Sequence, residues 1–202
     1  MLPPQKSIAL IGCYLPRQCG IATFTADLAS AILENSPAID CSIVAMNDRS
    51  QGYEYPDEVR FQISQNNLSE YRLAADFLNV RNPAVVCLQH EYGIFGGQRG
   101  SFIIELAKNL KSPLFTTLHT VLREPSAEER KIITQLSMLS ADGAQSAEFT
   151  IAFVLTTCSP APAGLTTSAP AAKNHSLPGA APRSVESVSV LRRTPGQSTD
   201  AG

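Results

Sequence analysis

Apolar and polar residues follow two different periods along the first two thirds of the chain. Short runs rich in β-branched residues are typical of strands buried on both faces, and they predict strands at residues 7–11, 41–46, 59–63, 84–88 and 113–118. Between them, apolar residues spaced three or four apart predict helices that begin near residues 20, 67, 101 and 126. Strands and helices that alternate in this way predict an α/β fold with a doubly wound parallel sheet.

Local patterns predict where the helices begin and which faces they bury. Asn67 precedes Glu70 by three residues, and Ser126 precedes Glu129 by three, so each pair is a capping-box pattern. Residues 59–63 alternate apolar with polar, which predicts a strand near a sheet edge. The predicted buried faces are Ile21, Phe24, Leu28, Ala31 and Ile32 in the first helix, and Leu68, Tyr71, Ala75 and Leu78 in the second.

The composition changes after residue 141. A short apolar run at residues 149–155 is compatible with one more strand, but residues 158–202 are mainly Ala, Pro, Ser, Thr and Gly without a regular period. Such a segment buries too little apolar surface to offset the entropy lost on ordering. We therefore expect a Rossmann-like domain at 6–140, an uncertain segment at 141–157 and a disordered C-terminal tail at 158–202. The abrupt change is typical of a reading-frame shift, a hypothesis that predicts a further domain in another frame of the downstream DNA.

Composition and charge argue against several classes of function. The 202 residues carry a formal charge of −2 with scattered basic residues, which gives no electrostatic case for nucleic-acid binding. The first residues lack the apolar core of a signal peptide, and no apolar run approaches the length of a transmembrane segment. The five cysteines are expected to be reduced thiols, and their spacing indicates no metal site. These features favour a cytoplasmic protein.

The strongest candidate for a site follows the predicted strand at 84–88. Gln89, His90 and Glu91 arrive together at the carboxyl end of this strand, where open α/β sheets bind ligands, and a glycine-rich loop comes next. His119 follows the next predicted strand, so we expect it at the same edge of the sheet. This edge is where the sequence predicts a binding or catalytic site.

The histidines and the glutamate each have a structural alternative. His119 could hydrogen-bond a ligand or stabilise developing charge, or its ring could simply bond a backbone carbonyl. His90 and Glu91 are adjacent and would point to opposite faces of a strand, but both could reach a ligand if the strand has already ended. Glu91 could orient a hydroxyl group or accept its proton, or it could form an ion pair with Arg99 or Arg123.

Two arginines and three glycines in the predicted loops are further candidates. Gly20 opens the first helix, whose amino-terminal amides could hold an anion, although a glycine there could also serve only the turn. Gly96 and Gly97 could let a ligand approach the main chain or could act only as turn formers. Arg17 and Arg123 could bind a phosphate or an acidic acceptor, against the common alternative of a solvated arginine.

Four stretches at the predicted strand ends together resemble a known family. They are IGCYLPRQCGIATF at 11–24, VAMND at 44–48, QHEYGIFGG at 89–97 and TTLHTVLREP at 116–125. Singly each is weak, but their order and their positions at strand ends resemble the amino-terminal half of a family-four glycosyltransferase of the GT-B fold, within a subgroup of bacterial hexosyltransferases. The resemblance covers residues 8 to about 139.

The resemblance implies a division of labour between two domains. The first binds a sugar or glycoconjugate acceptor, and the second holds a nucleotide sugar as co-substrate; the hexose moves with retention, and neither a metal nor another cofactor is required. It also implies that His119 faces the reacting sugar. From their chemistry and position, Glu91 is then a second catalytic candidate, and the binding candidates are Arg17, Gly20, His90, Gly96, Gly97 and Arg123. Because no second domain is recognisable after residue 141, we expect a truncated or frame-shifted copy that is inactive alone. The alternative is a non-catalytic Rossmann-like module that binds a saccharide or a partner chain.

Overall fold

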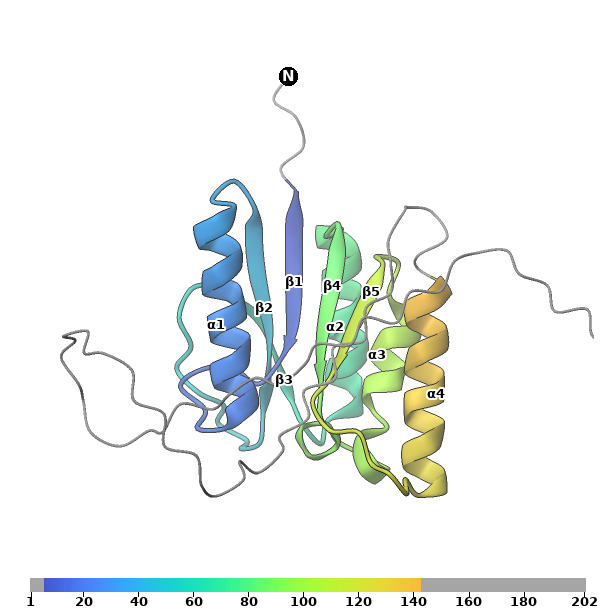
Figure 1. Ribbon diagram of the computed structural model, residues 1–202. Coiled ribbons are helices and arrows are strands. Elements are labelled where there is room, and N and C mark those ends of the chain that lie inside the picture. Colours follow the sequence, from blue (N-terminus) through green and yellow to red (C-terminus); the bar gives the residue numbers. More distant parts are fainter. Residues whose placement is uncertain (1–5, 143–202) are drawn as a thin grey trace, which may run out of the picture.

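The computed structural model describes residues 6–142 of the chain. In order, its elements are β1 (Ser7–Gly12), α1 (Gly20–Asn35), β2 (Asp40–Asn47), β3 (Val59–Ser64), α2 (Leu68–Arg81), β4 (Val85–His90), the single turns η1 (Tyr92–Ile94) and η2 (Gln98–Gly100), α3 (Ile103–Asn109), β5 (Leu114–Leu118) and α4 (Ala127–Asp142) (Figure 1). The extra strand and the tail predicted further along the chain lie outside the described residues.

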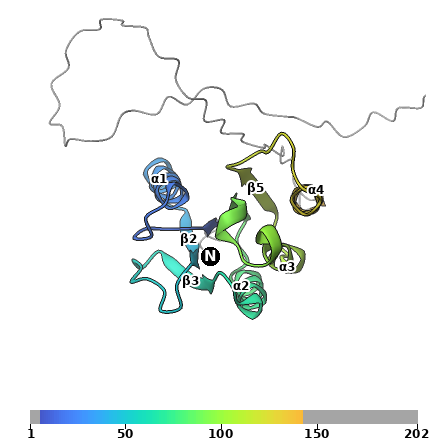
Figure 2. The ribbon, with the colours of Figure 1, turned by 90° about the horizontal axis from the view of Figure 1, so that it is seen from below.

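Within these residues the strands form one parallel sheet in the order β3-β2-β1-β4-β5. From β1 the strands are added outward to β2 and β3. The chain then returns to place β4 on the other side of β1, and β5 completes the sheet at the opposite edge. Helix α1 covers one face of the sheet, whereas α2 and α3 cover the other, with α4 beside α3 and β5 (Figure 2). This is the doubly wound, Rossmann-like α/β fold that the sequence predicted, and β3 lies at the sheet edge as its alternating pattern indicated.

Alternate residues of each strand supply two apolar cores, one on each face of the sheet. Leu10, Ile43 and Ala45 pack with Ala29 of α1. The larger core lies between the sheet and the helices of the opposite face, and it includes Ile11, Val44, Met46, Leu88, Tyr71, Leu78 and Leu106. Because both faces are covered, the central strands are almost entirely apolar, which is why their sequence runs were easy to recognise.

The capping residues explain where the helices begin. The Asn67 side chain accepts a hydrogen bond from the Ser69 amide at 3.2 Å and caps α2, while Glu70 bonds the Asn67 side chain and the Ser64 amide. Ahead of α4, the Ser126 amide donates to the Glu129 carboxylate at 2.8 Å, and the Glu129 amide donates to the Ser126 hydroxyl at 3.3 Å. Both predicted helix starts are therefore confirmed, the second as a reciprocal capping box.

The buried face of α1 differs from the predicted one. Ala22, Thr25 and Ala29 are the buried residues of this helix, whereas Ala31 is exposed and Phe24 is only half-buried. Small residues let α1 approach the sheet closely, and the larger apolar side chains flank that contact line.

No helix within residues 6–142 combines the length and apolar character needed to span a bilayer.

The segment after β4 is less regular than predicted. The helix expected from residue 101 is shorter, at Ile103–Asn109, and two single turns precede it. Gly97 lies between the two single turns and Gly100 ends the second, and their φ angles are 79° and 87°. These left-handed conformations change the direction of the backbone, so the turns do not merge with α3 into one helix. The loop is consequently held in a fixed, compact path at the carboxyl edge of the sheet.

Candidate functional site

The carboxyl ends of β4 and β5 bring two sequence-predicted residues together. His90 pairs with Leu118 in the register of these parallel strands, and the His119 amide donates a hydrogen bond to the His90 carbonyl at 3.0 Å. Pairing thus continues one residue past β5, which fixes the backbone of His119 beside the end of β4. Glu91 follows His90 directly and is the first residue of the loop after β4.

His119 is half-buried and has two defined ring contacts. Its Nε2 lies 3.0 Å from Oε1 of Gln89, and the Phe24 ring of α1 meets the imidazole edge-on at a centroid distance of 4.8 Å. Burial lowers the pKa of His119, and the negative charge of Glu91 opposes that change only in part. The ring is therefore neutral near pH 7, and its described partner is a side-chain amide rather than the backbone carbonyl of the structural alternative.

Glu91 links the two loops that leave the sheet. One carboxylate oxygen accepts a hydrogen bond from the Tyr92 amide at 3.0 Å and caps η1, while the other accepts one from the Thr120 hydroxyl. The alternative of an ion pair between Glu91 and Arg99 is wrong, because Arg99 lies 3.5 Å from the Glu129 carboxylate instead. Glu91 holds the loop after β4 against the loop after β5.

His90 belongs to β4 and is fully buried. Its ring stacks on Phe95 at 5.9 Å and meets Tyr92 edge-on at 5.0 Å, and neither ring nitrogen has a hydrogen-bond partner. Burial, with a smaller contribution from His119, lowers the pKa of His90 to about 4. The predicted strand ended at residue 88, but pairing with β5 carries β4 two residues further, so His90 lies beneath the loop and does not face an open site.

Gly96 and Gly97 are required by the packing of the loop. A Cβ on Gly96 would collide with the carbonyl oxygen of Gln65, and a Cβ on Gly97 would lie 2.5 Å from the Phe102 ring. The Gly96 amide also donates to the Tyr71 hydroxyl at 2.8 Å. These contacts support the turn-forming alternative for both glycines.

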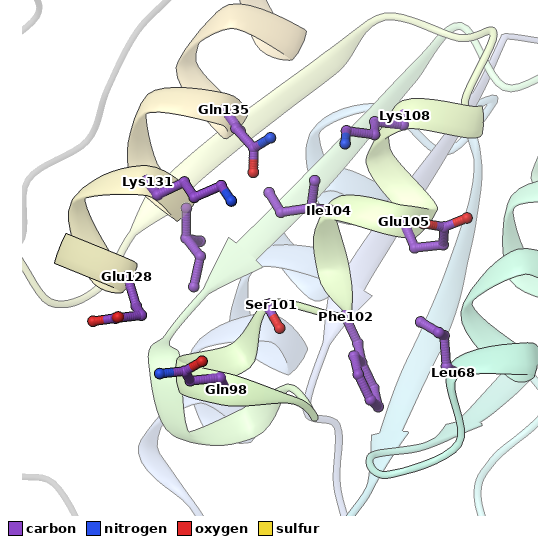
Figure 3. A pocket seen from close by; sticks show the side chains of 11 residues that line it. Leu68, Gln98, Ser101, Phe102, Ile104, Glu105, Lys108, Glu128, Lys131 and Gln135 are labelled. Carbon is purple, nitrogen blue, oxygen red and sulfur yellow. The ribbon is translucent and has the colours of Figure 1, made fainter.

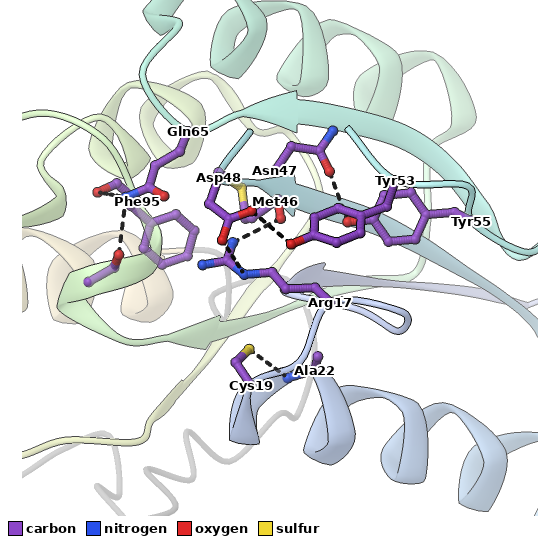
Figure 4. Close-up of polar contacts among 11 residues, drawn as sticks. Arg17, Cys19, Ala22, Met46, Asn47, Asp48, Tyr53, Tyr55, Gln65 and Phe95 are labelled. Carbon is purple, nitrogen blue, oxygen red and sulfur yellow. Dashed lines mark hydrogen bonds and ion pairs between the residues drawn. The ribbon is translucent and has the colours of Figure 1, made fainter. Parts of the chain in front are cut away.

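Arg17 is buried and already has partners. Its Nη1 donates to the Met46 carbonyl at 3.1 Å, and its Nε lies 3.4 Å from the Asp48 carboxylate (Figure 4). Gly20, the first residue of α1, is exposed and has no atom within 4 Å of the position its Cβ would take. Arg17 therefore ties the loop after β1 to the end of β2, whereas the open space beside Gly20 is not required by packing.

Arg123 lies exposed in the loop between β5 and α4. Nearby, a mainly apolar hollow of about 200 Å³ is lined by the end of β5, the following loop and α4, including Leu118, Val121 and Ile133. Tyr92 and Thr120, the two groups bonded to Glu91, also line it. The hollow therefore adjoins the carboxyl edge of the sheet.

A second hollow, of about 380 Å³, lies between α3 and α4 (Figure 3). Lys108, Lys131 and Gln135 are among its lining residues, and no sequence-predicted site residue is.

Among residues 6–142, no cluster of three or more His, Cys, Asp or Glu is arranged to hold a metal ion. The four cysteines of the described part are free thiols, and burial raises the pKa of Cys87 to about 12.

The sequence placed Gln89 at the predicted edge and Phe24 on a buried helix face, but it predicted neither their contacts with His119 nor the contact of Thr120 with Glu91. The only signal for Gln89 and Thr120 was their position next to His90 and His119 at strand ends. Phe24 lies in the first helix, so its contact with the His119 ring depends on how that helix crosses the sheet.

No family model matches the sequence, and no curated protein matches it. Among solved structures, the chain is similar to an alpha-glucosyltransferase in complex with UDP and a 13-mer DNA (12% identity, TM-score 0.45, covering 66% of this chain and 35% of that one). It is also similar to a UDP-N-acetylglucosamine 2-epimerase (12%, 0.41, 67% and 40%) and to S. aureus homoserine dehydrogenase (13%, 0.38, 69% and 30%). The chain spans about a third of the length of these structures, and at such TM-scores the likeness does not separate one function from another. Residues 6–142 are a Rossmann-like α/β unit with a candidate site at the carboxyl edge of its sheet.

Proposed function

We propose that this chain is the acceptor-side half of a family-four, GT-B retaining glycosyltransferase that transfers a hexose from a nucleotide sugar to a sugar or glycoconjugate. The observation that carries the proposal is the neutral, half-buried His119, held beside Glu91 at the ends of two adjacent parallel strands. Ligands of open α/β sheets bind at this edge. The sequence resemblance to the glycosyltransferases, motif by motif, supports the specific reaction.

His119 is the residue that faces the reacting sugar in this proposal. During transfer, the bond between the anomeric carbon and the diphosphate oxygen breaks and its electron pair leaves with the diphosphate. The acceptor hydroxyl oxygen bonds to the same carbon on the same face, and its proton passes to the departing diphosphate oxygen. A neutral imidazole can hydrogen-bond a sugar hydroxyl and stabilise positive charge as it develops at that carbon. A protonated ring would oppose that charge, so the lowered pKa of His119 suits the role.

The other residues take roles that agree with their contacts. Glu91 orients the acceptor hydroxyl while it links the two loops, and Arg123 contacts an acidic part of the acceptor. The amino end of α1 at Gly20 binds a donor phosphate through its amides, because the space beside it is open. Arg17, paired with the Asp48 carboxylate, holds the loop after β1 in place. His90 and the two loop glycines support the site from beneath, and a second, nucleotide-binding lobe faces this edge.

The test is a titration of the isotopically labelled full chain, followed by NMR, with UDP-glucose, GDP-mannose and simple methyl hexosides as probes. We expect amide shifts at Gly20, Glu91 and His119, and their loss in His119→Ala. Lys131→Ala, in the hollow between α3 and α4, is the matched control and should leave the shifts intact. Shifts confined to that hollow, or none at millimolar probe, would overturn the proposal. Binding of hexosides without any consumption of nucleotide sugar, even with a donor lobe added, favours the non-catalytic saccharide-binding module.

A further inference from the structure

Gln89 is a buried amide whose hydrogen bonding is only half satisfied. It is the residue before His90 in β4, and its side chain is on the opposite face of the strand, toward α1. The side chain is fully buried, Oε1 lies 3.0 Å from Nε2 of His119, and Nε2 of the amide has no partner. Leaving a buried amide N–H unpaired costs folding free energy, which an apolar residue at this position would avoid.

The surroundings of Gln89 are shaped to accept this side chain. Gly12 ends the neighbouring strand β1, and a Cβ on it would lie 3.0 Å from the Gln89 Cβ. A larger residue at position 12 would therefore displace the amide. The Phe24 ring of α1 meets the His119 ring in a T-shaped arrangement. Among the described side chains, the imidazole thus has Gln89 as a hydrogen-bond partner and Phe24 as an aromatic neighbour.

The direction of the hydrogen bond determines which nitrogen of His119 carries the proton. When Oε1 of Gln89 accepts, Nε2 must be the protonated nitrogen of the neutral ring, and Nδ1 keeps its lone pair. Among the described residues, Nδ1 of His119 has no hydrogen-bond partner. The ring would thus present an acceptor nitrogen, able to receive a hydrogen bond from a sugar hydroxyl.

We infer that Gln89 is a positioning residue that fixes the orientation and the Nε2–H tautomer of His119, so that Nδ1 is the nitrogen that meets the ligand. The inference rests on the role of His119 in the proposed function for its biological meaning, but the geometry within the protein stands without it. Glu91 and His90 are titratable groups that interact electrostatically with this ring, and Phe24 contacts it from α1.

Nitrogen NMR of the full chain, labelled at the histidine rings, tests the inference without any ligand. In the wild type we expect the His119 signals to show a proton on Nε2 and a bare Nδ1. Gln89→Leu removes the acceptor, so both tautomers should become populated. The pKa of His119 should also fall, because the protonated ring loses a hydrogen-bond acceptor. A Gln89→Leu protein with an unchanged tautomer and pKa, or with a raised pKa, would overturn the inference, since a raised pKa indicates that the amide donates to the ring.

Two further variants keep the test decisive if the leucine variant does not fold. Gln89→Glu retains an acceptor oxygen, so the Nε2–H signature should persist and the pKa should rise by about one pH unit or more. Loss of that signature at a pH above the raised pKa, where the ring is neutral, counts against the inference. Phe24→Leu is the matched control, because it removes the other ring contact, keeps the hydrogen bond, and should leave the tautomer unchanged while exposing the ring and raising its pKa.

The same spectra separate this inference from the proposed function. If the tautomer responds as expected but no sugar probe shifts the His119 signals, the positioning role holds and the glycosyltransferase proposal fails. If sugar probes shift the His119 signals but the tautomer is the same with and without Gln89, the positioning role fails and the glycosyltransferase proposal stands.

Discussion

His90 should make the folded state sensitive to acid by an amount that follows from its burial. Its pKa is lowered from 6.5 to about 4 in the folded chain, because the charged ring would lose its hydration there. Between these two values the unfolded chain binds a proton that the folded chain does not, so the free energy of unfolding increases with pH in this range. At about 1.4 kcal/mol per pH unit, the difference amounts to about 3 kcal/mol. That stability is present above pH 6.5 and is lost as the pH falls toward about 4.

The variant His90→Leu isolates this effect. Leucine fills most of the ring volume against Phe95 and Tyr92 and leaves no unpaired nitrogen, so most of the acid sensitivity in this range should disappear. Urea denaturation at several pH values from about 4 to 7.5 measures the free energy of unfolding of both proteins. His119 adds a smaller slope of the same sign in both, since its pKa is also lowered. Equal acid sensitivity in wild type and variant would refute the reasoning.

Three further substitutions test the packing and the caps. Gly96→Ala should lower the free energy of unfolding by about 1–3 kcal/mol in urea, because its Cβ meets the Gln65 carbonyl oxygen, whereas the control Gly93→Ala has open space and should change little. Ser126→Ala removes the cap of α4 and should cost about 1 kcal/mol, seen as a lower Tm; an unchanged Tm would contradict the cap. Cys19→Ser replaces a weak sulfur acceptor with a better capping residue and should raise the Tm, while a fall would refute its role in α1.

The order and type of the elements followed from local chemistry that the sequence displays. Buried parallel strands require unbroken apolar runs, and Asn67 and Ser126 stand where helix amides need acceptors. The start of α1 at Gly20 was also predicted, although its cap is the sulfur of Cys19 rather than an oxygen. The predicted face of α1 was confirmed in part: Ile21, Leu28 and Ile32 pack against the cores. The fully buried apolar positions of this helix are Ala22 and Ala29, since small residues let it lie close to the sheet.

The candidate site was predictable as a place but not as a set of contacts. Strand ends located Glu91 and His119 at one edge, because parallel strands finish on the same side of a sheet. The end of β4 depends on pairing with β5, so no local signal told that His90 would be enclosed. Likewise, the bonds of Glu91 to Thr120 and of Gln89 to His119 join residues about thirty positions apart, and only the register of the two strands brings them within reach.

The hydroxyl of Tyr71 joins the chain after β3 to the loop after β4, alongside the hydrogen bond from the Gln65 side chain to the Gly93 carbonyl. It donates to the Gln65 carbonyl after β3 and accepts from the Gly96 amide in the loop after β4, each at 2.8 Å. Burial raises the pKa of Tyr71 to about 12, so the phenol keeps its proton and performs both tasks at any physiological pH. A molecule that displaced the glycine-rich loop would therefore break a hydrogen bond of Tyr71 and disturb the residues that follow the edge strand β3.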